Sequence, residues 1–215
     1  MASCWRYLGF RALQGHNALL STSCKTPQTA HPAFARLRHD NHQLTLTPHQ
    51  LLNSAGLLLI TQAILLLQPT HTASQKRLGA YIHSALNFTG ILALMGGLAV
   101  IVYNKEAHHG AHFTSAHARL GLTVYILFAI QALVGAAAFY TPAVFGGVSR
   151  AKATYKYHRV SGYLVVVLSL AAVATATQTD FNRNVLHIRL WAVLAVAVIL
   201  LIGVLPRIKK QKLGL

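Results

Sequence analysis

Long apolar stretches alternate with short polar connections along most of this chain. Five of the stretches are long enough to cross about 30 Å of hydrocarbon at a rise of about 1.5 Å per residue. They cover residues 49–68, 81–103, 117–140, 158–178 and 187–205. A bilayer offers no water to the backbone, so each span is expected to be a helix. The pattern therefore predicts an all-α membrane protein, a bundle of transmembrane helices.

The apolar pattern divides the chain into three parts. Residues 1–44 form a polar, basic N-terminal tail, residues 45–206 the transmembrane domain, and residues 207–215 a basic C-terminal tail. Arg6 and Arg11 accompany a weak amphipathic pattern in the first tail, which is typical of an organellar presequence. A disordered tail or a mispredicted segment fits the same residues, so both interpretations stay open.

Composition supports the membrane assignment. Of 215 residues, 54% are hydrophobic and only 10% are charged, whereas soluble domains average about 25% charged residues. The net charge is +16, but the basic residues flank apolar runs and form no stripe on a soluble face. We therefore expect membrane lipid as the partner and no nucleic acid.

The cysteines exclude several metal centres. Cys4 and Cys24 are the only two, both lie in the N-terminal tail, and no CxxC or CxxCH motif occurs. Thiolate zinc sites, iron–sulfur clusters and covalently attached haem are therefore not expected.

Loop charge predicts the orientation. If the N-terminal side of the membrane is called side A, residues 69–80, 141–157 and 206–215 lie on side B. These segments hold nine Lys or Arg residues and no Asp or Glu. An excess of Lys and Arg in short loops marks the cytoplasmic face. Side B and the C-terminus are therefore predicted to be cytoplasmic.

Four histidines stand at the starts of predicted spans: His49, His83, His117 and His158. Consecutive spans start on opposite faces, so His49 and His117 lie near side A, and the other two near side B. Two neutral imidazoles facing each other across a bundle are the ligands of a b-type haem with both axial positions filled. The pattern predicts two haem b groups, held by His49 with His117 and by His83 with His158.

Other interpretations of these histidines are simpler. A single histidine at a membrane-helix end is often an interfacial residue bonded to headgroups or to the backbone. Zinc or copper is a weaker alternative, because two histidines without Cys or carboxylate make an incomplete shell. Four histidines paired by side favour haem.

Four segments resemble the cytochrome b561 family of transmembrane haem proteins, over about residues 45–180. They read TPHQLLNSAGLLLITQAILLLQP, YIHSALNFTG, NKEAHHGAHFTSAHARLGL and YKYHRVSGYL. The likeness is closest to the short, fungal-type single-domain members. It implies four haem-binding helices within a six-helix protein, with the same two histidine pairs.

The resemblance also implies an activity. Family members act as transmembrane oxidoreductases that pass electrons from cytoplasmic ascorbate to monodehydroascorbate or ferric chelates on the other side. They are often homodimers, so a homodimer is implied here as well. Basic residues near the cytoplasmic haem serve ascorbate in the family. Lys76, Arg77 and Arg150 are the candidates here, because positive charge attracts the ascorbate anion; as positive-inside residues they are equally well explained.

The chain departs from the family pattern in two places. The helix that precedes the His49 helix in the family is absent, and the polar tail stands in its place. A His–Asn pair commonly ends the His83 helix in the family, where this chain has Tyr103 and Asn104.

Two other functions remain as alternatives. Quinone-linked cytochrome b anchor subunits of larger oxidoreductases also pair histidines between helices, but they require a partner subunit. A small transporter or scaffold without a cofactor would be colourless and inert toward ascorbate.

Overall fold

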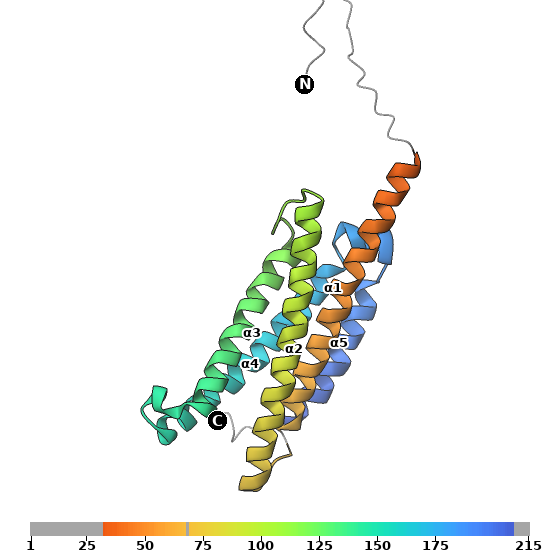
Figure 1. Cartoon of the computed structure of the whole chain (residues 1–215). Helices are drawn as coiled ribbons and strands as arrows, with labels where there is room; N and C mark the ends of the chain where they lie inside the picture. The colour runs from red at the N-terminus through yellow and green to blue at the C-terminus, as the bar shows by residue number, and fades with distance from the viewer. Residues whose placement is uncertain (1–31, 68, 209–215) are drawn as a thin grey trace, which may run out of the picture.

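Five long α-helices dominate the computed structural model, which describes residues 32–67 and 69–208 (Figure 1). They are α1 (Pro32–Leu66), α2 (Ala73–Ala107), α3 (Ala116–Tyr140), α4 (Val148–Ala176) and α5 (Leu190–Val204). Three short helical turns accompany them: η1 (Pro142–Phe145), η2 (Asn182–Leu186) and η3 (Leu205–Arg207). Each long helix carries a stretch that is long and apolar enough to cross a membrane. The predicted all-α transmembrane bundle is confirmed.

The helices begin earlier than the predicted spans. Helix α2 starts eight residues before position 81, and α4 starts ten residues before position 158. Helix α1 starts at Pro32, inside the segment assigned to the tail; residues 1–31, which hold both cysteines, lie outside the described residues. The prediction that the four histidines share a place at helix starts is therefore wrong for three of them: only His117 lies in the first turn of its helix, and His49 lies 17 residues inside α1. His83 and His158 each lie ten residues inside their helices.

The early start of α2 has a local cause. The Thr72 side chain accepts a hydrogen bond from the Gln75 backbone at 3.2 Å, and the Gln75 side chain accepts one from the Thr72 backbone at 3.1 Å. This reciprocal capping box satisfies amide groups that the first helical turn leaves unpaired. A polar helical extension is thereby stable outside the apolar stretch, where hydropathy alone gives no signal.

Helix α5 begins later than predicted. His187 was expected to open the fifth span, but it adopts a left-handed conformation with φ of 55°, after the η2 turn. The fifth helix starts three residues further on, at Leu190. A non-glycine residue with positive φ does not continue a right-handed helix.

The first four helices form two antiparallel hairpins, α1 with α2 and α3 with α4. Within each hairpin the backbones pack closely, and between the hairpins they approach far less. Gly56 and Gly90 meet at the crossing of α1 and α2. A Cβ atom on Gly56 would lie 2.7 Å from the Gly90 carbonyl oxygen, and one on Gly90 would lie 3.0 Å from that of Gly56. Small residues permit this close approach, as is common between membrane helices.

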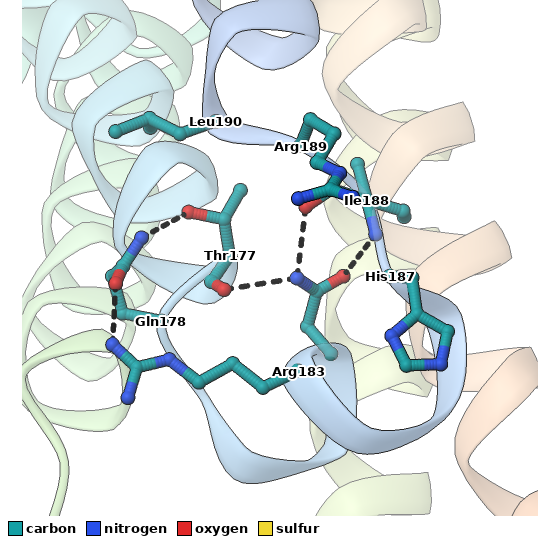
Figure 2. A pocket seen from close by; sticks show the side chains of 8 residues that line it. Thr177, Gln178, Arg183, His187, Ile188, Arg189 and Leu190 are labelled. Atoms are coloured by element: carbon teal, nitrogen blue, oxygen red, sulfur yellow. Dashed lines mark hydrogen bonds between the residues drawn. The ribbon is translucent and has the colours of Figure 1, made fainter.

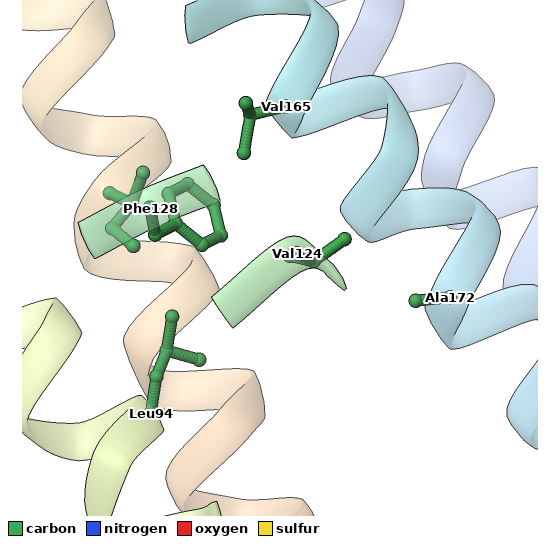
Figure 3. Close-up of a cluster of buried hydrophobic side chains, with 6 residues drawn as sticks. Leu94, Val124, Phe128, Val165 and Ala172 are labelled. Atoms are coloured by element: carbon green, nitrogen blue, oxygen red, sulfur yellow. The ribbon is translucent and has the colours of Figure 1, made fainter. Parts of the chain in front are cut away.

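A central apolar layer joins the two hairpins. All four helices contribute to it, and its buried members are Ile60, Leu94, Val124, Phe128, Val165 and Ala172 (Figure 3). In Figure 3 the Phe128 and Val124 side chains of α3 lie between Leu94 of α2 and Val165 of α4. Contact between the hairpins is thus concentrated near the middle of the bundle.

Alanine at position 56 tests the hairpin crossing. The added methyl group has no room between α1 and α2, so Gly56→Ala should destabilise the protein by about 1–3 kcal/mol. Thermal unfolding of the detergent-solubilised protein measures this loss. The matched control is Gly203→Ala in α5, where a Cβ atom meets nothing within 4 Å. Equal melting temperatures for the two variants would contradict the close crossing.

Candidate functional site

Helices α1 and α2 orient each other's histidine. The Nδ1 atom of His49 donates to the Gly97 carbonyl at 2.8 Å, and that of His83 donates to the Ala63 carbonyl at 2.9 Å. Gly97 follows His83 by 14 positions, and Ala63 follows His49 by the same number. Fourteen residues are close to four helical turns of about 3.6 residues, so donor and acceptor share one face of the hairpin. The two histidine levels are about 21 Å apart along the helix axis.

Helices α3 and α4 have one of the two corresponding hydrogen bonds. His117 donates through Nδ1 to the Ala172 carbonyl at 2.9 Å, and Ala172 follows His158 by 14 positions. His158 differs, because its buried Nδ1 atom has no hydrogen-bond partner among the described residues. Its ring packs against Gly135 of α3, where a Cβ atom would lie 2.9 Å from the imidazole Cε1.

The backbone acceptors determine which nitrogen carries the proton in three of the imidazoles. A neutral histidine that donates through Nδ1 keeps its lone pair on Nε2. This is the usual state of a metal-binding histidine, whose second nitrogen is held by a carbonyl or carboxylate. His49, His83 and His117 are thus prepared to bind a metal through Nε2.

The structure brings the histidines together in two pairs. At side A, His49 and His117 lie close enough to interact electrostatically, and at side B the same holds for His83 and His158. Each pair takes one histidine from each hairpin. A group bound between the members of a pair would therefore link the two hairpins.

Asn53 and Asn87 complete the histidine surroundings, and the sequence analysis missed them. Each lies one turn after a histidine and donates through Nδ2 to that histidine's carbonyl, at 2.7 Å for Asn53 and 2.8 Å for Asn87. In both cases Nδ2 also lies 3.3 Å from the imidazole Nδ1. The segments HQLLNSAG and HSALNFTG share the pattern H-x₃-N-x₂-G. That internal repeat is the signal from which the asparagines could have been found.

Two glycines leave space beside the other two histidines. Gly121 and Gly162 lie one turn after His117 and His158 and are half-buried. A Cβ atom at either position would meet nothing within 4 Å. Residues four apart on a helix share a face, so each space lies on the face that carries the histidine. This suits a broad, flat group lying against the helix.

No larger metal cluster occurs among the side chains that the structure describes, those of residues 48–67 and 69–208. There, no group of three or more His, Cys, Asp or Glu side chains is placed to hold an ion. A structural zinc site needs about four protein ligands. A haem with two axial histidines, by contrast, needs only two protein ligands.

Comparison with known proteins agrees with this geometry. A family model described as eukaryotic cytochrome b561 matches residues 48–183, which include all four histidines. The chain belongs to the cytochrome b561 family. No curated protein and no solved structure matches it. This cytochrome b561 is thus an integral, multi-pass membrane protein that binds haem b and transfers electrons across the membrane.

The residues of this cytochrome b561 fit haem b. The paired imidazoles would supply two ligands to an iron, the unpartnered nitrogen of His158 belongs to such a pair, and Gly121 and Gly162 would leave room for the macrocycle. Haem held by two histidines needs no covalent link to the protein.

The basic residues expected to bind substrate flank the side-B pair. Arg77 lies six positions before His83, and Arg150 lies eight positions before His158, so each is about two helical turns further out. The Arg77 guanidinium lies 5.9 Å from the centre of the Tyr81 ring, and Arg150 packs against Gly146, whose φ is 79°. Lys76 lies in the first turn of α2. None of the three forms an ion pair with a carboxylate in the described part of the chain.

A polar pocket of about 290 Å³ lies on side A, where α4 leads into α5 (Figure 2). Asn182 holds its wall: its Nδ2 atom donates to the Thr177 and Ile188 carbonyls at 2.9 and 3.0 Å, and its Oδ1 atom accepts from the Ile188 amide at 3.2 Å. Arg183 donates to the Gln178 side chain at 2.6 Å. None of the four paired histidines lines this pocket.

Filling the space beside His117 or His158 tests the haem fit. Gly121→Leu and Gly162→Leu place atoms where no protein atom lies, so each should leave the fold intact but lower haem content to about half, by excluding haem from one site. Pyridine haemochrome analysis per chain measures the content. Gly203→Leu is the control, since its Cβ position is also open but lies on α5. Full haem content in both test variants would show that haem does not occupy these spaces.

Proposed function

We propose that this protein transfers electrons across the membrane through two haem b groups, from cytoplasmic ascorbate to monodehydroascorbate or ferric iron on the opposite side. The observation that carries the proposal is the arrangement of histidines. Each side of the bundle has one pair of histidines, each pair takes one member from each hairpin, and the two levels are about 21 Å apart.

The four histidines are the proposed axial ligands. His49 and His117 hold the haem at side A, and His83 and His158 hold the haem at side B. Bound haem supplies one-electron chemistry that no amino-acid side chain here provides. With an imidazole on each axial position, the chain leaves oxygen no open coordination site.

Apolar side chains between the two histidine levels exclude water from the proposed electron-transfer path. The central layer of Ile60, Leu94, Val124, Phe128 and Val165 is buried and apolar. Ions are strongly disfavoured in such surroundings, because a buried charge without a partner costs much free energy. The layer therefore separates electron transfer from the passage of protons or ions.

The basic loops support side B as the ascorbate side. Excess Lys and Arg assigns side B to the cytoplasm, and Lys76, Arg77 and Arg150 lie toward that side of the side-B histidines without ion pairs to described carboxylates. Ascorbate is an anion at neutral pH, so this charge raises its local concentration and its association rate. These three residues are the proposed ascorbate contacts.

Removing the side-B pair tests the proposal. The double variant His83→Ala/His158→Ala should retain one haem with a bis-histidine b-type spectrum. Ascorbate added on side B of proteoliposomes should then no longer reduce an acceptor inside, because the entry site is gone. Reduced-minus-oxidised absorbance and acceptor reduction measure the two effects, and His109→Ala in the side-A loop is the control. Unchanged haem content in the double variant would refute these ligands. A wild type that ascorbate reduces only with an added subunit or quinol would favour a quinone-linked anchor.

Neutralising the basic residues tests the ascorbate contacts. Arg77→Gln and Arg150→Gln should each lower the second-order rate constant for reduction by ascorbate severalfold at low salt, and the difference from wild type should shrink as salt screens the charges. Stopped-flow reduction at two ionic strengths measures this. Lys156→Gln is the matched control, because its ammonium lies 4.9 Å from the Tyr157 ring centre on the same side. Equal effects at all three positions would indicate general surface charge and no specific contact.

A further inference from the structure

The two ends of the bundle are built alike, position by position. His49, Asn53, Gly56 and Ile60 of α1 correspond to His83, Asn87, Gly90 and Leu94 of α2 at equal spacings. In the other hairpin, the buried residues Val124 and Val165 each lie seven positions after a paired histidine. A difference between corresponding positions therefore indicates how side A and side B differ in function.

One such difference lies next to an asparagine. Tyr125 follows His117 by eight positions, and the corresponding residue after His158 is Val166. The Tyr125 hydroxyl donates to the Asn53 Oδ1 atom at 2.6 Å, which connects α3 to α1 at side A. At side B, no hydroxyl donates to Asn87 among the hydrogen bonds of the described residues.

The Tyr125 hydrogen bond polarises the Asn53 amide. With its oxygen held by the phenol, the amide presents Nδ2 to the His49 carbonyl at 2.7 Å, and the same nitrogen lies 3.3 Å from the His49 Nδ1 atom. The His49 Nδ1 proton is already donated to Gly97. The positive end of the amide dipole is thereby held beside the imidazole. Asn87 presents Nδ2 to His83 in the same way without a hydroxyl on its oxygen, so the difference at side A is the polarisation of the amide by the phenol.

A positive dipole end beside a metal ligand acts on the redox equilibrium. The oxidised iron centre carries one more positive charge than the reduced centre, so the dipole disfavours the oxidised state and raises the reduction potential. Hydrogen bonding around the ligands is one of the recognised means by which a protein sets haem potential. In a buried site such a dipole is poorly screened.

We propose that Tyr125 is a positioning residue that acts through Asn53 to raise the reduction potential of the side-A haem above that of the side-B haem. Transfer from side B to side A is then favoured energetically. The inference rests on the proposed function, in which His49 is a ligand of the side-A haem.

Potentiometric titration of Tyr125→Phe tests the inference. The substitution removes only the hydroxyl, so two haems per chain should remain. At a fixed potential, the ratio of reduced to oxidised side-A haem should fall about tenfold, which is about 59 mV for one electron. The side-B component should not move. The His158→Ala protein, which is expected to retain only the side-A haem, identifies the side-A component.

Three further variants separate this role from a general structural effect. Asn53→Ala should lower the side-A potential, and adding Tyr125→Phe to it should have no further effect, because the hydroxyl acts through the amide. Asn87→Ala should move only the side-B component. Tyr155→Phe is the matched control, since its hydroxyl contacts only the Ala138 carbonyl, at 3.5 Å, and it should move neither.

The outcomes distinguish the inference from the proposed function. Two haems at unchanged potentials in Tyr125→Phe would overturn the inference and leave the proposed function standing. Loss of the side-A haem from that variant would assign Tyr125 a purely structural role and would also overturn it. A wild-type protein without a bis-histidine haem spectrum would overturn the proposed function itself.

Discussion

The hydrogen bond from a histidine Nδ1 atom to a carbonyl of the neighbouring helix is the interaction on which the proposed site depends. It occurs at His49, His83 and His117, each time with an acceptor 14 positions beyond the histidine of the paired helix. One contact therefore sets the register of a hairpin, the orientation of an imidazole and the nitrogen left for a metal. Close helix packing and ligand geometry are parts of the same arrangement.

The packing of the bundle is consistent with these hydrogen bonds between histidines and carbonyls. Carbonyls reach the imidazoles because glycines let the helices approach, at Gly56 with Gly90 and at Gly97 beside His49 and Asn53. Between the hairpins the helices have to stay further apart, because the proposed haem groups have to fit there at two levels. Direct contact there is concentrated in the apolar layer around Phe128. Haem at each end would complete the joint between the hairpins.

The sequence was sufficient for the architecture and insufficient for the surroundings of the histidines. Five apolar stretches predicted five helices, which the structure has. Counting spans paired His49 with His117 and His83 with His158, and these ligand pairs stay a prediction. Helix starts were wrong at α1, α2, α4 and α5. At α2 the reason is a capped polar turn that lies outside any apolar stretch. The exceptional Nδ1 atom of His158 and the hydrogen bond from Tyr125 to Asn53 depend on tertiary contacts between residues distant in the chain. Periodicity cannot indicate such contacts, although the repeated H-x₃-N-x₂-G pattern does point to the asparagines.

The central claim is that two hairpins hold two haems, each bound by one histidine from either hairpin. The number of haem irons per polypeptide in the purified wild-type protein tests it most directly. Iron analysis with quantitative amino-acid analysis should give two per chain, both low-spin with two axial histidines by electron paramagnetic resonance. One haem per chain, or a high-spin iron with an open axial position, would contradict the account.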